Sequence, residues 1–189
     1  MDFDLPITTE KMAKSYFTSM GCSHFHMARE YPARYDEYKK FGITQETERL
    51  WKFDSFEMMY KAIWLNGNEE TTHILHSSMA DLACSLDTEY VYEKMLAATH
   101  RVLKTTPDGF RFIVAETVVG RNDYIARSGF IYHTYDLGRP DLAKEFALLS
   151  LKLAAADDVP HARDINNNQS ERIRQVVLKC KSIREELNI

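Results

Sequence analysis

Residues 122–157 read NDYIARSGFIYHTYDLGRPDLAKEFALLSLKLAAAD, which is the strongest structural signal in the chain. It predicts two helices joined by a tight turn at residues 137–140. Pro140 suits the start of the second helix, and Asp141 is a good capping residue there. A helix that is apolar on most sides is buried by more than one neighbour, so we expect the second helix to be enclosed. Its large apolar stripe is Leu142, Phe146, Leu149 and Leu153, and its small stripe is Ala143, Ala147, Ser150 and Ala154.

The helix before the turn is the expected partner of this enclosed helix. Gly138 is expected to end it, either as the residue that follows the helix, where glycine readily adopts a positive φ, or as part of the turn. We expect Gly129 inside this first helix, where glycine costs about 1 kcal/mol relative to alanine. Close approach of the backbone to the Ala143 and Ala147 stripe would account for that cost, and an incidental surface glycine is the alternative.

The helix pair resembles a tetratricopeptide-type repeat. That family has a small residue and an aromatic residue in the first helix, a glycine at the turn and recurring alanine in the second helix. With Gly138 as the turn glycine, Ala143, Ala147 and Ser150 take the family's small or aromatic positions on the second helix. The resemblance covers residues 122–157 and implies a helical module that binds a protein or peptide partner. It places these residues in or just before the binding groove: Arg121, Asn122, Ile125, Ser128, Tyr132, Tyr135 and Asp136.

Composition limits the remaining possibilities. With 189 residues and 44% hydrophobic residues, the chain is long enough to bury one good core. A net charge of −4 provides no basic surface for nucleic acid. No apolar run has the length of a membrane span, and the acidic N-terminus does not resemble a secretory signal. Three cysteines, far apart and odd in number, indicate a reducing compartment, so we expect a cytoplasmic protein.

Helical patterns with short punctuation extend over the rest of the chain. We predict one all-α domain over residues 1–189, with antiparallel helical hairpins stacked in a short array or an irregular bundle. Residues 1–43 are expected to form short helices, the first ending at Gly21, and residues 44–157 to form the hairpins. A polar loop at 158–168 precedes an amphipathic helix at 169–189 that closes the array. Residues 110–119 are rich in β-branched residues but have helical spacing, so we predict helix there and keep a strand as the alternative.

Cys22, His24 and His26 are the first candidate metal ligands. A thiolate and two imidazoles suit zinc or copper. Residues i and i+2 of a helix point in nearly opposite directions. This group therefore requires extended backbone to bind one ion.

His73 and His76 form the second candidate group, three and six residues after Glu70 on a predicted helix. Di-iron bundles carry a Glu-x-x-His motif on each of two helices, and this chain has one such motif. We therefore expect no metal and no cofactor, and we predict a protein- or peptide-binding module without catalytic activity. The alternative is a small metal-dependent helical enzyme that uses the His24 and His26 region or the His73 and His76 region.

Overall fold

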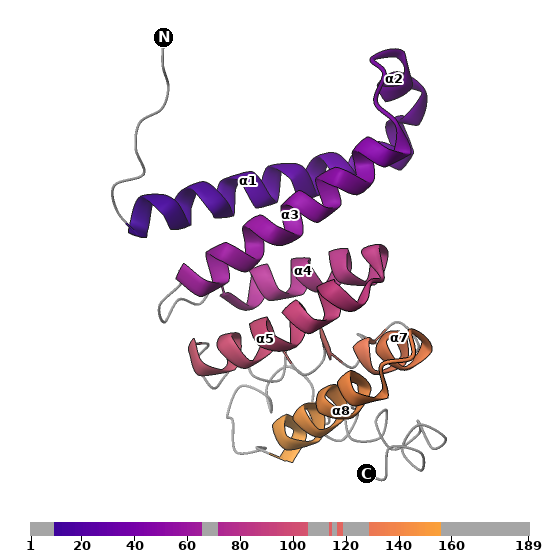
Figure 1. Ribbon diagram of the computed structural model, residues 1–189. Helices are drawn as coiled ribbons and strands as arrows, with labels where there is room; N and C mark the ends of the chain where they lie inside the picture. The colour runs from indigo at the N-terminus through magenta and orange to yellow at the C-terminus, as the bar shows by residue number, and fades with distance from the viewer. Residues whose placement is uncertain (1–9, 66–71, 106–113, 115–116, 119–128, 156–189) are drawn as a thin grey trace, which may run out of the picture. The chain divides into compact units, whose positions relative to one another are not determined.

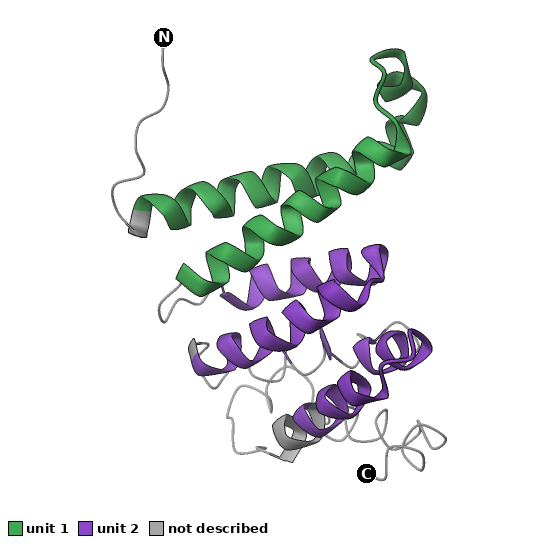
Figure 2. Cartoon of the chain, viewed as in Figure 1, with its two compact units in different colours: residues 1–67 green, residues 68–189 purple. Residues whose placement is uncertain are grey.

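The computed structural model of the chain describes residues 10–65, 72–105, 114, 117–118 and 129–155 (Figure 1). Within these ranges every regular element is a helix and none is a strand. The all-α prediction is confirmed for this part of the chain. The chain divides into two compact units, residues 1–67 and residues 68–189, drawn in green and purple in Figure 2. A single domain over residues 1–189 stays a prediction.

The first unit is a long helical hairpin. α1 (Glu10–Glu30) leads through a 3-10 turn, η1 (Tyr31–Arg34), and a short α2 (Tyr35–Lys40) into α3 (Gln45–Leu65) (Figure 1). α1 and α3 pack against each other and run antiparallel, since Phe17 near the start of α1 lies under Lys61 near the end of α3. The connection is held by aromatic contacts, with Tyr31 stacked on Tyr38 at 5.8 Å between ring centroids.

The end of α2 and the start of α3 follow from local sequence signals. Gly42 has a φ of +75° and donates from its N–H to the Lys39 carbonyl at 3.1 Å, while Ile43 donates to Tyr38 at 3.1 Å. This pair of bonds is the Schellman motif, in which glycine takes the left-handed position that other residues adopt only with strain. Thr44 then caps α3 by accepting the Thr47 N–H at 3.3 Å.

α1 continues through Gly21, which is the point of close approach between α1 and α3. A Cβ atom on Gly21 would lie 2.9 Å from Cγ and 3.3 Å from the backbone N of Met59. Ser55 of α3 donates a hydrogen bond of 2.6 Å to the Gly21 carbonyl. The prediction that Gly21 ends a short first helix is therefore wrong. Because Gly21 has no side chain, α1 and α3 can pack closely at this point. Residues 10–30 form one long helix instead of short ones.

In the second unit, α4 (Thr72–Leu86) and α5 (Glu89–Thr105) form an antiparallel pair. Thr88 begins α5, and its hydroxyl accepts the Val91 N–H at 3.4 Å. Four large apolar residues of α4 recur with the helical period and are all buried: Leu75, Met79, Leu82 and Leu86. Val114, Thr117 and Val118, the described residues of the 110–119 run, are helical and buried, as their spacing predicts.

α7 (Phe130–Asp136) and α8 (Pro140–Ala155) form the hairpin predicted from residues 122–157. The Phe130 and Phe146 rings lie 5.2 Å apart, and Phe130 also contacts Tyr92 of α5 at 5.6 Å. The large and the small apolar stripes of α8 are both buried over residues 140–149, where its side chains are described. The buried stripe residues are Leu142, Ala143, Phe146, Ala147 and Leu149. The helix packs against α7 and against α5, so the prediction that it is enclosed on more than one side is confirmed.

Two details of this hairpin differ from expectation. Gly129 is buried but has extended backbone angles and caps the start of α7, so the prediction that it lies inside the helix is wrong. Pro140 is the first residue of α8, and Asp141 lies in its first turn instead of capping it. The structure describes no side chains for three further stripe residues, Ser150, Leu153 and Ala154. The predicted polar loop and closing helix, within residues 156–189, lie outside the described residues.

Candidate functional site

Three of the seven predicted binding residues lie on α7. Phe130, Ile131 and Thr134 of α7 are buried, whereas Tyr132 and Tyr135 are partly exposed and Asp136 is exposed. Residues three and four positions apart on a helix are neighbours on one face. Tyr132, Tyr135 and Asp136 therefore form one surface, which we call the outer face of α7. The other four predicted residues lie outside the described residues: Arg121, Asn122, Ile125 and Ser128.

The turn after α7 fixes the position of Arg139. Gly138 has a φ of +78°, and its N–H donates to the Tyr135 carbonyl at 2.9 Å. The Arg139 N–H donates to the Thr134 carbonyl at 2.9 Å, which completes a second Schellman motif. The predicted role of Gly138 as the glycine that follows the helix is confirmed. Because both bonds fix the backbone of Arg139, its side chain leaves the turn in a defined direction.

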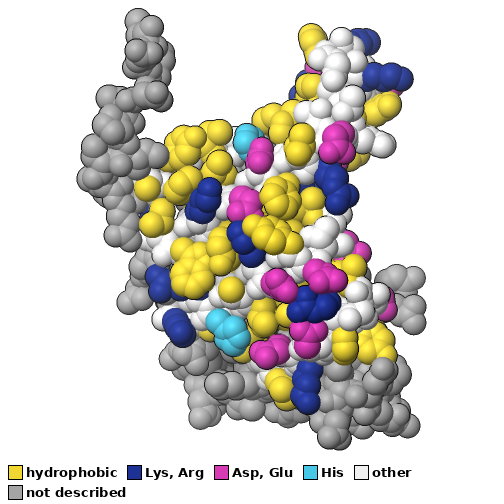
Figure 3. All heavy atoms as spheres, viewed as in Figure 1, with side chains coloured by type: hydrophobic (Ala, Val, Ile, Leu, Met, Phe, Trp, Pro, Cys, Tyr) yellow, Lys and Arg dark blue, Asp and Glu magenta, His cyan; other side chains and the backbone are white. Residues whose placement is uncertain are grey.

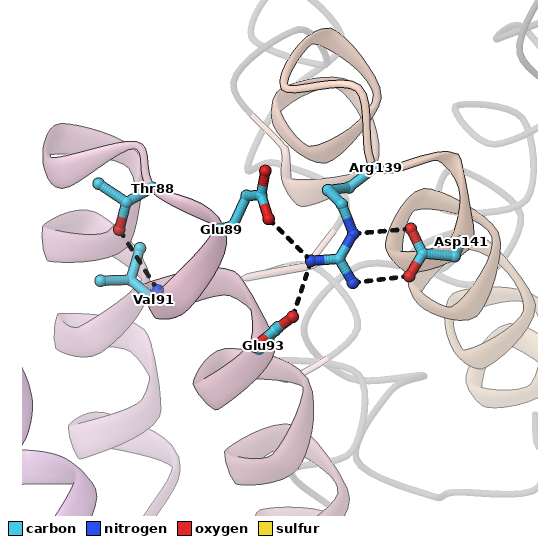
Figure 4. Close-up of polar contacts among 6 residues, drawn as sticks. All are labelled: Thr88, Glu89, Val91, Glu93, Arg139 and Asp141. Atoms are coloured by element: carbon cyan, nitrogen blue, oxygen red, sulfur yellow. Dashed lines mark hydrogen bonds and ion pairs between the residues drawn. The ribbon is translucent and has the colours of Figure 1, made fainter.

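Arg139 binds three carboxylates from two helices (Figure 4). Its Nε and Nη2 atoms donate to both oxygens of Asp141 at 2.9 and 2.7 Å. Its Nη1 atom donates to Glu93 at 2.7 Å and to Glu89 at 3.2 Å, both on α5. A bidentate guanidinium–carboxylate pair is strongly directional. The three carboxylates of Asp141, Glu89 and Glu93, which we call the acidic edge, are thereby gathered around one cation.

The electrostatics of the acidic edge are unbalanced. Three carboxylates against one guanidinium leave a formal charge of −2. The hydrogen bond from Arg139 lowers the pKa of Asp141, and the bond to Asp141 in turn raises the pKa of Arg139. All three carboxylates are more than half exposed. Exposed ion pairs contribute little stability, so the main consequence of this cluster is a localised negative surface.

Asp87 connects α4, α5 and α7 nearby. Its φ of +49° is unusual for a residue with a side chain. One oxygen of its carboxylate accepts the Tyr92 hydroxyl at 3.0 Å and lies 3.0 Å from Nδ1 of His133. Short polar residues tolerate the left-handed region, and here the strained backbone turns the carboxylate toward two other helices. Asp87 thereby holds α7 against α5 beside the acidic edge.

Sequence reasoning did not identify Arg139, Glu89 or Glu93 as functional candidates. Glu89 and Glu93 are four residues apart at the start of a helix. Acidic residues are common near helix N-termini, so the sequence gives no reason to assign them a binding role. Arg139 reads as a turn residue. Arg139 is 46 positions from Glu93 and 50 from Glu89 in the sequence. Patterns of neighbouring residues therefore could not predict that these side chains meet.

The described residues of the two candidate metal groups do not converge on one point, and Glu70 of the second group lies outside the described residues. Cys22, His24 and His26 all lie on α1, so the extended backbone that this group requires is absent. His76 is fully buried and its Nε2 lies 2.8 Å from the Thr99 hydroxyl, which itself donates to the Met95 carbonyl. Among the described residues, no group of three or more His, Cys, Asp or Glu side chains is arranged to hold a metal ion.

Cys84 of the second unit is largely buried and has the environment of a core residue. Burial raises the pKa of Cys84 to about 11. At neutral pH the thiol therefore keeps its proton, and the thiolate is the form that acts as a nucleophile or metal ligand. Neither Cys84 nor Cys22 forms a disulfide.

In comparisons with known proteins, no family model, curated protein or solved structure matches the chain. Within the described helices, none combines the length and the apolar composition needed to cross a bilayer. The candidate site is accordingly defined by its own geometry: the outer face of α7 together with the acidic edge.

Proposed function

We propose that this chain is a protein- or peptide-binding module without catalytic activity, and that the outer face of α7 and the acidic edge contact the partner. The observation that carries the proposal is the placement of two half-exposed tyrosines, Tyr132 and Tyr135, one turn before a cluster with surplus negative charge. Tyrosine is favoured at interfaces because it adds large rigid contact area with a polar tip. The resemblance of residues 122–157 to a tetratricopeptide-type repeat supports the same surface.

The chemistry of this surface defines the partner. A segment that binds there carries at least one Lys or Arg side chain for Asp136 and the acidic edge, and an adjacent apolar side chain that packs on the tyrosine rings. Opposite charges across an interface accelerate association and fix the register more than they raise affinity. We include a reducing compartment such as the cytoplasm in this proposal, since the three cysteines of the chain are odd in number and far apart in the sequence.

The experiment is a selection of random peptides displayed on phage against the full-length protein, followed by titration of the enriched peptide. Enriched sequences are expected to share a basic residue next to an apolar one. Asp136→Asn and the double substitution Tyr132→Ala/Tyr135→Ala are expected to weaken binding of that peptide about tenfold or more. Glu145→Gln is the matched control, because Glu145 is an exposed carboxylate on the next helix of the same hairpin.

Three results would contradict the proposal. The first is that the selected peptides share no basic residue. The second is that the Tyr132→Ala/Tyr135→Ala variant binds the peptide as tightly as the wild type. The third is that Glu145→Gln and Asp136→Asn lose the same amount of peptide affinity. Raising the NaCl concentration is expected to slow association of the peptide with the wild type, because exposed charges are screened beyond about 10 Å at moderate ionic strength.

A further inference from the structure

A row of large hydrophobic side chains lies on the outer face of α3, away from its contact with α1. Leu50 is 54% exposed, Phe53 37% and Trp64 44%, and Tyr60 lies between them with its ring 5.9 Å from that of Trp64. Hydrophobic side chains gather over α1 and α3 on the face drawn in Figure 3. We call Leu50, Phe53, Tyr60 and Trp64 the α3 row.

The α3 row is separate from the core face of the same helix. The buried residues of α3 are Ser55, Phe56, Met59, Ala62 and Ile63. At 100° per residue, Phe53 points roughly 120° and Trp64 roughly 140° away from Met59, in the same direction around the helix. α3 is therefore apolar on two faces, and one of them already packs within the hairpin. A helix that is apolar on two faces is typical of one that contacts a second layer.

The spacing of the α3 row is that of a coiled-coil seam. Leu50, Phe53, Glu57, Tyr60 and Trp64 follow one another at intervals of three, four, three and four residues. This is the a and d pattern that faces a partner helix, with Glu57 as its one charged position. A partner helix in this seam would cover the exposed rings along most of the length of α3.

We infer that the partner is a second copy of this chain, paired antiparallel along the α3 row. Lys61 lies one turn after Glu57, so an antiparallel copy places Glu57 opposite Lys61 of the second copy. The midpoint between Glu57 and Lys61 falls at Met59. The midpoint between Phe53 and Trp64 falls at almost the same level. One twofold axis therefore satisfies both the charge pair and the aromatic pair, which is the requirement for an isologous interface.

Charge also selects this orientation over the parallel one. A parallel pair would place Glu57 beside Glu57 of the second copy inside the seam, and like charges at such positions disfavour pairing. In the isolated hairpin the Lys61 Nζ lies 5.4 Å from the centroid of the Phe17 ring. That exposed cation–π contact is worth about 0.5–1 kcal/mol, little enough for Lys61 to exchange it for a carboxylate across the interface.

The test is sedimentation equilibrium of the full-length protein over a range of concentrations. The wild type is expected to approach a mass of twice 22.0 kDa. Phe53→Glu and Trp64→Glu are each expected to raise the dimer dissociation constant at least tenfold. Leu148→Glu is the matched control, since Leu148 lies on α8 and its exposed fraction of 47% is close to the 44% of Trp64. This variant is expected to leave dimerisation unchanged. Far-ultraviolet circular dichroism confirms that each variant is folded.

Charge reversal provides a readout that does not depend on the aromatic substitutions. Glu57→Lys alone and Lys61→Glu alone are each expected to weaken the dimer, and the double variant Glu57→Lys/Lys61→Glu is expected to restore it. A protein that stays monomeric at the highest concentration overturns the inference. So does a dimer that Leu148→Glu disrupts as much as Phe53→Glu, or a double variant that is weaker than both single ones.

Discussion

Substitution of Gly21 by alanine tests how closely α1 and α3 approach. The added Cβ would lie 2.9 Å from Met59 Cγ, 3.3 Å from the Met59 backbone N and 3.4 Å from Met58 Cβ. Met59 is buried, so its side chain has little room to move, and the backbone atom can shift only with the helix. Overpacking of this kind costs about 1–3 kcal/mol, whereas alanine gains about 1 kcal/mol over glycine inside a helix. We expect a net loss of about 0–2 kcal/mol in the free energy of unfolding.

A double-mutant cycle separates the two opposing effects. In a Met59→Ala background the nearest atom, Met59 Cγ, is gone, and Gly21→Ala is expected to become neutral or stabilising. Urea denaturation monitored by circular dichroism gives the four stabilities, and contacting residues are expected to show a coupling of about 0.5–3 kcal/mol. If Gly21→Ala stabilises the protein equally in both backgrounds, the helices do not approach closely at this position and the packing argument fails.

Three further predictions concern buried and networked groups. Ser55→Ala removes the donor to the Gly21 carbonyl and is expected to lower the free energy of unfolding by about 0.5–1.5 kcal/mol; an unchanged urea midpoint would contradict that bond. Burial lowers the pKa of His76 from 6.5 to about 4, so below pH 6.5 the unfolded chain binds a proton that the folded chain does not. Stability is therefore lost as the pH falls from 6.5 to 4, by about 3 kcal/mol, and His76→Leu is expected to lack this component in urea titrations at several pH values. Arg139→Gln is expected to lower the melting temperature and to respond to NaCl by becoming more stable, because salt screens the repulsion among the remaining carboxylates; an Arg139→Gln variant that loses stability in NaCl would indicate that these carboxylates do not repel.

Local sequence signals predicted the parts of the fold that depend on neighbouring residues. Gly138 occupies the left-handed position of the Schellman motif that follows α7, as expected. The described residues of the 110–119 run, Val114, Thr117 and Val118, are helical and buried as their spacing predicts. In each case the decisive bonds or contacts lie within about one turn of the residue or repeat with the helical period, so the sequence contains the information directly.

The candidate site could be predicted only in part, for the same physical reason. The placement of Tyr132, Tyr135 and Asp136 on one face follows from helical spacing alone. The pairing of Arg139 with Glu89 and Glu93 depends on how α8 packs against α5, and that is decided by the contacts of Phe130 and Phe146. Charges at the ends of different helices meet only after the hydrophobic layers have set the helix positions.

Glycine shows most clearly why one residue type supports opposite interpretations. The absence of a side chain permits a positive φ and also permits close contact, and these two uses have different consequences for helix continuity. Gly21 was expected to end a helix, yet it lies where α1 meets Met59 and receives the Ser55 hydroxyl at its carbonyl. Gly129 was expected inside a helix, yet it has a φ of −78° and caps the start of α7. What distinguishes the two uses is which atoms lie opposite the glycine. For Gly21 these atoms belong to Met59 and Ser55, which are more than thirty residues away in the sequence. Distant packing thus decides which glycine ends a helix and which one joins two.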